Sequence, residues 1–507
     1  MTLHDKKEAF LNRVIPYRGR KPFFLEVRSS ELFILIAVCW SVFTDVFLYG
    51  IIVPVVPFAL QDRIHVSRQD TQRWVSVLLS VYAAALLVVS PICGFVADRT
   101  TSRRGPLLLG LIVLFASTVM FCLGKTIAIL VAARLLQGAS AAVVWTVALA
   151  LLADTVKHDE VGKALGYVSV AMTLGVLFGP MIGGVVFERS GYYEVFAITF
   201  GVIGLDIILR LLLVEKKIAA RWLEPTPTPT QIQSCPSIDQ GFAPSKLSET
   251  PSAVAEKNTS IAATRTAGVR RKRKIPSILI LLKSRRLLAA FWGSFVTSVT
   301  MTALDTTIPL YVNQIFGWGS LGAGLVFLAL LAPNFAGPLI GHWTDKYGPR
   351  WISASGLLFS IPFWVLLRLV DHDGIRQQVL LCGLLLLLGI ACAFIMTPLL
   401  AEFSKVCDAK ERQQPDLFAG KSVYGQSYGI FNVAWAAGSL VGPLVAAAIV
   451  DAAGWKTMTW SMALFSAVGV LPTLLYSGGM ISRKSLQRPS PDETPPSEVH
   501  GLNDLTS

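Results

Sequence analysis

The chain has 507 residues, a net charge of +13 and 53% hydrophobic residues, but only 15% charged residues. Soluble domains carry about 25% charged residues, so this composition and a mean hydropathy of +0.58 exclude an ordinary soluble fold. The basic excess does not indicate a nucleic-acid partner. The lysines and arginines gather in loops that the positive-inside rule places in the cytoplasm.

Apolar residues form blocks of the length that crosses a bilayer as a helix, about 20 residues. Helices can satisfy their own backbone hydrogen bonds in lipid, so the sequence predicts an all-α integral membrane protein. The first block is too long for a cleavable signal peptide, and an even number of spans leaves both termini in the cytoplasm. The twelve predicted spans are 32–60, 74–97, 106–124, 127–153, 164–187, 192–214, 287–312, 322–343, 351–370, 378–401, 423–450 and 456–478.

A long polar loop divides these spans into two six-helix bundles. The predicted parts are a cytoplasmic tail at 1–31, a bundle at 32–214, a disordered basic cytoplasmic loop at 215–286, a bundle at 287–478 and a cytoplasmic tail at 479–507. The loop is rich in Pro, Thr and Ser, a composition that cannot form a core. Its basic run at 270–274 fits a nuclear-localisation signal poorly and anchoring near anionic lipid better. The sequon at Asn258 is expected to stay unglycosylated.

The first predicted span contains a carboxylate, Asp45, near its middle. A charge at that depth costs on the order of 2.5–3.5 kcal/mol on insertion scales, so such residues serve ion pairing, proton exchange or substrate contact. Asp305 is the counterpart in the seventh span. In the sixth span, Asp206 and Arg210 are four residues apart, which predicts a structural intrahelical pair.

The two halves repeat two patterns in the same order. The stretches 175–191 and 438–454 have identical spacings of Gly, Pro, an acid and Gly, and the loops at 94–99 and 341–346 also match. This indicates internal duplication. Duplicated halves around a site at the membrane midplane are a common plan for secondary transporters.

The repeated loop follows the pattern Gly-x-x-x-Asp-Arg/Lys-x-Gly-x-Arg. The second copy comprises Gly341, Asp345, Lys346, Gly348 and Arg350, and the first keeps Gly94, Asp98 and Arg99 but has Thr101 where glycine is expected. A carboxylate at a helix end can face the N-terminus of a neighbouring helix. We therefore predict a cytoplasmic latch for the outward-open state. The alternative is that these charges only set the topology.

The fourth span carries Arg134-Leu-Leu-Gln137-Gly138. A buried arginine stays charged and needs a carboxylate or carbonyl groups nearby, and Asp45 is the natural candidate. If a conformational change weakened that pair, Asp45 could take up a proton, and the pair would act as a proton switch. A static ion pair that fixes helix packing is the alternative.

The fifth span has a glycine pattern comprising Gly166, Gly175, Gly179, Pro180, Gly183 and Gly184. Glycines on one face let helices approach closely, and a proline weakens the helix locally. Taken alone, this pattern could serve only packing.

Together the three motifs resemble those of the major facilitator superfamily, and specifically its twelve-span drug:proton antiporter branch, over nearly all of 32–478. The resemblance implies two pseudo-symmetric six-helix bundles, and the glycine pattern, as an antiporter motif, implies export. Within the branch the chain looks like vesicular amine transporters and fungal efflux pumps. Three charged positions of the amine carriers fall on Tyr82, near Ala393 and on Asn432, which weakens the case for a strongly cationic substrate.

The sequence therefore predicts a proton-coupled exporter of a drug, toxin or secondary metabolite, with Asp45, Asp305 and Arg134 in proton coupling. Tyr82, Gln137 and Asn432 are substrate-cavity candidates. The aromatic residues Trp145, Tyr167, Tyr424 and Trp435 could line a cavity, face lipid or serve packing. An amine uptake or vesicle-loading carrier is the first alternative, and a transporter-like receptor is the second.

Enzymatic activity is not expected, because the sequence shows no metal-ligand cluster, no nucleophile with a positioned base and no phosphate loop. No cofactor is expected. The expected partners are membrane lipid, a small-molecule substrate and protons, with no nucleic acid and the chain acting as a monomer. The plasma membrane is the predicted location, with vacuolar or vesicular membranes as alternatives.

Overall fold

The computed structural model describes residues 24–52, 55–56, 59–100, 102–223, 277–318, 320–413 and 423–478. Within them, eleven helices are long and apolar enough to cross a membrane, which confirms the all-α membrane class. The sequon at Asn258 and the basic run at 270–274 lie outside the described residues.

The N-terminal half contains six spans in chain order. These are α3 (Glu31–Ile52), α5 (Arg68–Arg99), α6 (Arg104–Leu123), the continuous series α7 (Ile127–Val143), η2 (Val144–Ala148) and α8 (Leu149–Thr155), α9 (Val161–Ser190) and α10 (Tyr192–Leu212). The η2 segment is π-helical. The first span ends at Ile52 rather than at the predicted residue 60, and a short π-helix, η1 (Ala59–Arg63), precedes α5.

The C-terminal half begins with α14 and ends with the longest helix of the chain. Its elements are α14 (Arg285–Phe316), α15 (Ser320–Leu331), η3 (Ala332–Ala336), α16 (Gly337–Tyr347), α17 (Pro349–Leu366), η4 (Leu367–Leu369), α18 (Ile375–Gln413) and α19 (Tyr424–Tyr476). The 53 residues of α19 would extend about 80 Å as one helix, far more than one crossing of a bilayer core of about 30 Å. Gly454 breaks α19 with φ 77° and ψ 175°, so α19 supplies two crossings and the total is twelve.

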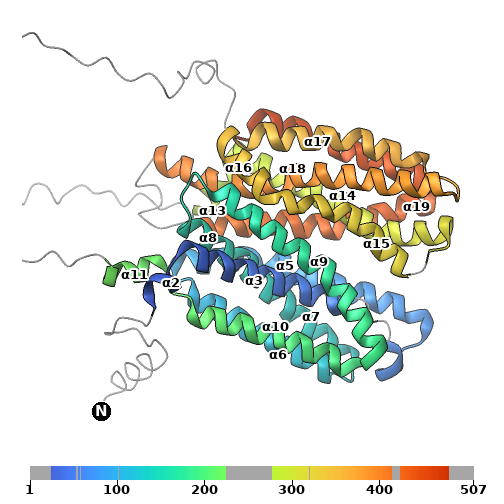
Figure 1. Ribbon diagram of the computed structural model, residues 1–507, viewed down its shortest axis with the longest axis horizontal. Coiled ribbons are helices and arrows are strands. Elements are labelled where there is room, and N and C mark those ends of the chain that lie inside the picture. Colours follow the sequence, from blue (N-terminus) through green and yellow to red (C-terminus); the bar gives the residue numbers. More distant parts are fainter. Residues whose placement is uncertain are drawn as a thin grey trace, which may run out of the picture.

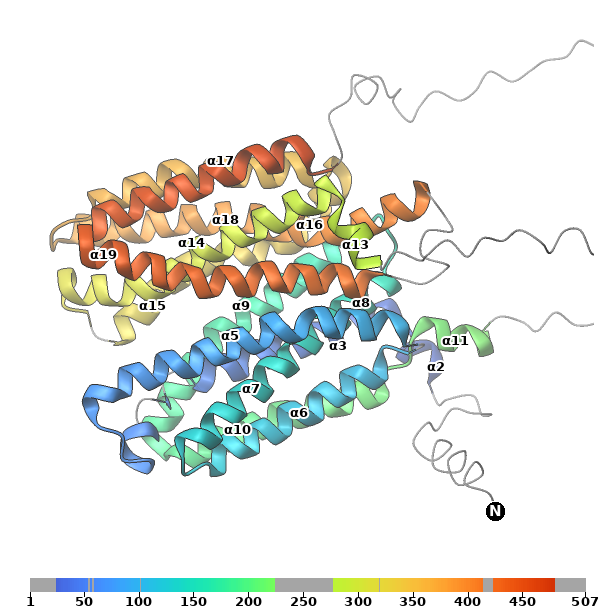
Figure 2. The same ribbon diagram turned by 180° about the vertical axis from the view of Figure 1, so that it is seen from behind.

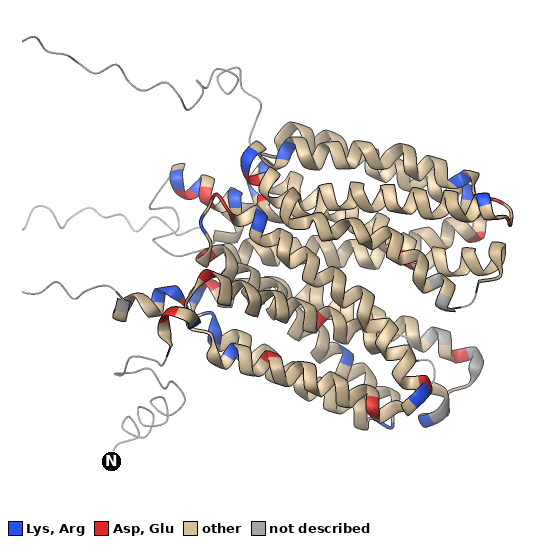
Figure 3. Ribbon diagram, viewed as in Figure 1, with Lys and Arg blue, Asp and Glu red and all other residues tan. Residues whose placement is uncertain are grey.

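The two halves form two bundles that lie side by side (Figures 1 and 2). Short helices flank one end of the molecule: α2 (Leu25–Arg28), α11 (Lys216–Leu223) and α13 (Ser277–Leu282). We call this end, where α3 and α14 begin, the tail end, and the opposite end the far end. Charged residues concentrate at both ends of the ribbon, and few lie between them (Figure 3).

The buried core shows how the halves meet. One cluster joins them at the tail end, with Val38 and Leu149 of the first half and Phe403 and Tyr428 of the second among its members. Toward the far end each half has a separate cluster, around Phe47 to Phe196 in the first half and around Val299 to Met462 in the second. The two halves therefore share one buried core at the tail end, whereas toward the far end each half has a core of its own.

The prediction of disorder throughout 215–286 is wrong at both ends of that segment. Residues 216–223 and 277–282 are helical, and α14 begins at Arg285. Glu215 is buried, and its Oε1 accepts hydrogen bonds from the Ser102 hydroxyl at 2.6 Å and from the backbone of Arg104 at 2.9 Å. The disorder prediction rested on the average composition of the whole loop. Average composition carries no information about the contacts that order its two ends.

Candidate functional site

Two carboxylates at the tail end bind helix N-termini across the boundary between the halves. Asp98 of α5 accepts backbone hydrogen bonds at 2.9 Å from Gly425 and Gln426, at the start of α19. Asp345 of α16 accepts two backbone bonds, also at 2.9 Å, from Gly162 and Lys163 at the start of α9. The partial positive charge of a helix N-terminus favours a carboxylate there. The arrangement is reciprocal, since each half supplies one carboxylate and one helix.

Each of these two carboxylates also pairs with a cationic side chain, and the two cations come from different parts of the fold. Arg103 donates to Asp98 at 3.0 Å and to Asp154 at 3.2 Å. Asp345 instead pairs at 3.0 Å with Lys405, which comes from α18 of the same half.

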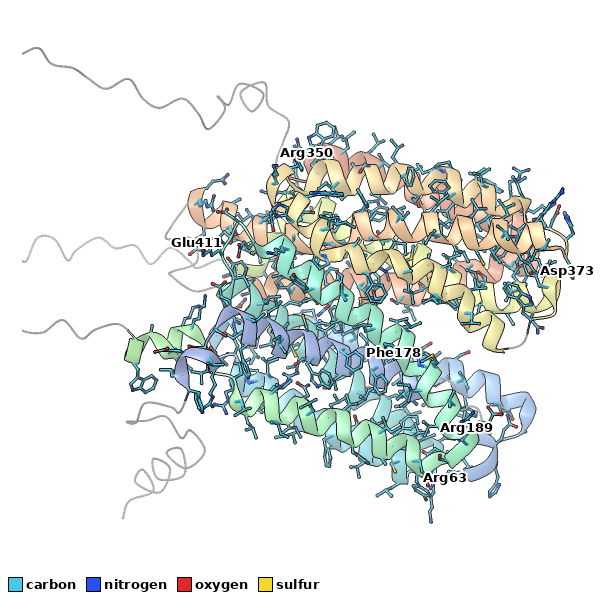
Figure 4. All side chains as sticks on the ribbon, viewed as in Figure 1. Arg63, Phe178, Arg189, Arg350, Asp373 and Glu411 are labelled. Carbon is cyan, nitrogen blue, oxygen red and sulfur yellow. The ribbon has the colours of Figure 1, made fainter. Side chains whose placement is uncertain are left out.

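Three other basic residues of the repeated loop pattern, Arg99, Lys346 and Arg350, bond to groups other than the two carboxylates. The Arg99 guanidinium sits 3.9 Å from the centroid of the Phe95 ring, and Lys346 lies 5.3 Å from the ring centroid of the next tyrosine. Arg350, labelled at the tail end in Figure 4, donates to the carbonyl of Ser477 at 2.6 Å. These three residues therefore contact nearby rings or a backbone carbonyl, and not the two carboxylates.

Glycines allow the helices that carry the latches to meet backbone to backbone. A Cβ added at Gly94 would lie 2.5 Å from the carbonyl oxygen of Gly425, and one added at Gly341 would lie 2.0 Å from that of Gly162. Neither position could hold a side chain while the tail end stays closed.

The predicted antiporter motif packs α9 against α3. Added Cβ atoms at Gly175, Gly179 and Gly183 would meet backbone atoms of α3 at 2.4–3.1 Å. Pro180 contacts the same helix, because a Cβ at Gly50 would lie 2.9 Å from the proline ring. The glycines thus set the distance between two helices of the first half.

The remaining motif glycines differ from these. Gly166 faces the other half, where an added Cβ would lie 2.3 Å from the carbonyl oxygen of Gly337. A Cβ added at Gly184 would meet no other described atom within 4 Å. Most of the motif therefore packs against α3 within the first half, and Gly166 contacts the second half.

Asp45 is 2% exposed, deep within the first span. Its Oδ2 accepts a hydrogen bond at 3.0 Å from the indole N–H of Trp145, in η2. Within the described chain Oδ1 has no partner. A carboxylate whose single bonded partner is neutral can take up a proton without breaking an ion pair.

The predicted pairing of Asp45 with Arg134 is wrong in this structure. Asp45 comes 14 residues after the start of α3 and Arg134 comes 21 residues before Thr155, so they lie about 21 Å and 31 Å along their spans from the tail end. Arg134 donates to Gln137 at 3.0 Å, and its guanidinium carbon lies 5.3 Å from the centroid of the Phe121 ring. Its Nε and Nη2 have no hydrogen-bond partner among the described residues.

The other two intramembrane acids differ from each other. Asp206 and Arg210 form the predicted intrahelical pair at 3.0 Å, and Ser41 donates to the same carboxylate at 2.9 Å. Asp305 is exposed, and its charge acts on Tyr49 of the other half and on Cys392 of α18. The Asp305 carboxylate therefore lies at the boundary between the halves.

The three substrate-cavity candidates do not lie together at one open surface. Gln137 is buried and accepts from Arg134. Asn432 is buried, and its side-chain amide donates to Thr146 of the other half at 3.0 Å. Tyr82 is half-buried, with its ring 4.9 Å from that of Tyr49. In this conformation Asn432 bridges the halves.

A further group of bonds, one of which joins the halves, was not predicted. Nδ1 of His158, between α8 and α9, lies 2.8 Å from Oδ2 of Asp408 in α18, and the Tyr424 hydroxyl donates to the same carboxylate. His158 and Tyr424 line a tail-end pocket of about 250 Å³, which Glu411 also borders. Glu411 is labelled at the tail end in Figure 4. No periodic pattern predicts this contact, because its members come from three separate segments of the chain.

Two six-helix bundles with duplicated motifs, reciprocal contacts between a carboxylate and a helix N-terminus at one end, and a buried carboxylate, Asp45, bonded to a neutral indole are the features of a secondary transporter. The Major Facilitator Superfamily profile matches residues 38–336 and 322–505, and the chain belongs to that family. It is a non-enzymatic, multi-pass membrane transporter.

Several relatives are similar over most of the chain. The uncharacterized MFS-type transporter C18.02 of Schizosaccharomyces pombe is 33% identical over 84% of this chain and 92% of its own. The MFS-type transporter ppzB of Metarhizium rileyi is 31% identical over 90% and 97%. The vesicular acetylcholine transporter of Drosophila melanogaster is 24% identical over 88% and 71%.

Among solved structures, the human organic anion transporter MFSD10 (TETRAN) matches with a TM-score of 0.61. The match covers 87% of this chain and 99% of the other, at 18% identity. At that identity the likeness concerns the fold.

Proposed function

We propose that this chain is a proton-coupled exporter that moves a small organic molecule out of the cytoplasm by alternating access. The single observation that carries the proposal is the environment of Asp45: a buried carboxylate within the first span that bonds, among the described residues, to a neutral indole alone. Intramembrane acids that face the protein interior commonly relay protons. Asp305, at the boundary between the halves, is a second proton-binding candidate.

The tail end is proposed to face the cytoplasm, with both termini. Basic residues at or near helix termini of this end, among them Arg99, Arg104, Lys217 and Arg285, support this orientation by the positive-inside rule. With the latches closed and the far-end clusters separate, the conformation is then the outward-facing one. The plasma membrane is the proposed location, because export from there removes a compound from the cell.

A drug, toxin or secondary metabolite is the proposed substrate class. The relatives support a fungal-type transporter, and the glycine motif of α9 resembles that of exporters in this superfamily. An amine carrier is a second candidate, favoured by the exposed carboxylate of Asp305 and by the similarity to vesicular acetylcholine transporters.

The test is flux in proteoliposomes with an imposed pH gradient. Wild-type protein should drive a fluorescent organic cation or a neutral dye against its gradient while protons move the other way. Asp45→Asn should abolish pH-driven flux, and Asp373→Asn, a change in the far-end loop, should leave it intact (Figure 4). Full pH-driven flux in Asp45→Asn would remove the basis of the proposal.

Asp305→Asn separates the two candidates. If Asp305 binds protons, the variant should lose pH dependence for neutral and cationic substrates alike. If it binds an amine, only cationic substrates should lose flux, with a raised KM and an unchanged pH profile for neutral ones.

A further inference from the structure

The fourth span contains a π-helical turn, η2, between α7 and α8. Such turns are rare, and they appear mostly as single turns inside α-helices, frequently at functional sites. The η2 segment contacts α3 and α5 of its own half and α19 of the other half. It is therefore a local irregularity placed where the halves meet.

Two consecutive side chains of η2 bond to different halves. Trp145 donates to Asp45 of the same half at 3.0 Å, and Thr146 accepts from Asn432 of the other half at 3.0 Å. Thr146 is fully buried and Asn432 is 2% exposed. Because the two residues are adjacent, a change of backbone in this turn that moves one also moves the other.

The Trp145 ring also lies against both halves. It packs on a buried cluster formed by Leu86, Ala141 and Ala142 of the first half and Ala436 of the second. A movement of the indole therefore alters packing across the boundary as well as the bond to Asp45.

We propose that η2 transmits the protonation state of Asp45 to the bond between Thr146 and Asn432. This proposal rests on the proposed function, because it assumes that Asp45 exchanges protons. A charged carboxylate holds the indole N–H through a charge-assisted hydrogen bond, which is stronger than a neutral one. Protonation weakens that bond, releases Trp145 and lets η2 shift, so that Thr146 separates from Asn432 and the tail end can open.

Other ionisable groups near Asp45 do not replace this route. From α10 the pair Asp206 and Arg210 faces Asp45, and the two are bonded to each other. From α5 the Tyr82 hydroxyl lies within electrostatic range, and Arg134 of α7 acts on that same hydroxyl. The direct hydrogen bond of Asp45 is to Trp145, which makes Trp145 a positioning residue and Thr146 the contact to the other half.

The experiment follows the tail end directly. Spin labels at residues 159 and 412, which are exposed at the tail end in opposite halves, report the ratio of open to closed molecules in liposomes at different pH. In otherwise wild-type protein this ratio should rise as the pH falls. In Asp45→Asn it should not change with pH.

Three substitutions then address η2. Trp145→Phe keeps an aromatic ring without the N–H, and Thr146→Val keeps the shape without the hydroxyl. Each should reduce the pH-dependent change in the ratio at least threefold. Thr146→Ser should restore it, which a purely structural role of the methyl group would not predict. The matched control is Trp435→Phe in α19. Trp435, like Trp145, packs against the buried cluster at the tail end, and this variant should behave as wild type.

The pH profile gives a second readout. Since an N–H donor favours the charged carboxylate, transport by Trp145→Phe should reach half-maximum at a higher pH than transport by wild type. An unchanged profile and ratio in both Trp145→Phe and Thr146→Val would overturn the coupling through η2. If Asp45→Asn also kept its pH response, the proposed function itself would fail.

Discussion

The two latches at the tail end are copies of one device, and they differ in an instructive way. In both, an aspartate accepts two backbone hydrogen bonds from the first residues of a helix in the other half. In both, a glycine one turn earlier meets the opposite backbone. The cations differ: Asp98 pairs with Arg103 of its own loop, whereas Asp345 pairs with Lys405 of another helix.

The difference continues into the loops that follow. Gly348 caps α17 with φ +84°, a conformation that glycine favours. The first copy lacks a glycine at the corresponding place, and α6 begins after Arg103 at φ −75°. The Arg103 side chain is only 7% exposed and bridges Asp98 to Asp154. The duplication has therefore kept the carboxylate, the glycine and the helix N-terminus, while the source of positive charge has changed.

The largest effect is expected from adding a methyl group at either latch glycine. Gly341→Ala would place a Cβ 2.0 Å from a backbone oxygen and Gly94→Ala would place one at 2.5 Å, so the halves could not close as they do here. Overpacking of this kind costs about 3 kcal/mol, which lowers the closed population at least a hundredfold. The measurement is the open-to-closed ratio from the tail-end spin labels.

Gly184→Ala is the matched control, because an added Cβ there has nothing within 4 Å. The ratio in this variant should equal that of wild type. If the Gly341→Ala protein had the same open-to-closed ratio as the Gly184→Ala protein, close approach of the backbones at Gly341 would not be required for closure of the tail end.

An intermediate effect is expected from neutralising the two latch aspartates. Asp98→Asn should shift the ratio toward open by about 2 kcal/mol, since it removes charge-assisted bonds and leaves Arg103 buried with one carboxylate fewer. Asp345→Asn should cost about 1 kcal/mol, because the partner Lys405 is more exposed, at 18%. The spin labels at residues 159 and 412 measure the open-to-closed ratio in both variants. Equal changes in that ratio would show that burial of the cation does not set the strength of the contact.

The sequence allowed the fold and part of the site to be predicted, for identifiable reasons. The twelve crossings follow from the length of the apolar runs, and the pair of Asp206 and Arg210 follows from a spacing that holds within one helix. The repeated spacing around Asp98 and Asp345 pointed to a shared role because duplicated halves place equivalent residues in equivalent positions.

Contacts between helices were harder to predict. The motif around Arg134 suggested Asp45 as its partner, but a sequence does not state how far along the membrane normal two antiparallel helices are offset. Trp145 was one of four aromatic residues with an open role, and nothing local distinguishes a π-helical turn in an apolar run. His158 and Asp408 are brought together only by the packing of both halves.

The smallest effect is expected from the basic residues that define the loop pattern most visibly. Arg99 stacks on Phe95 and Lys346 on the neighbouring tyrosine, and the described bonds of both latch carboxylates go to other groups. Arg99→Gln and Lys346→Gln should therefore shift the open-to-closed ratio by no more than about 0.5 kcal/mol, the usual range for surface substitutions. A shift as large as that of Asp98→Asn would mean that these cations move onto the carboxylates in the tail-open conformation. In that case the repeated loop would stabilise both ends of the transport cycle, and the two copies would be equivalent through their cations after all.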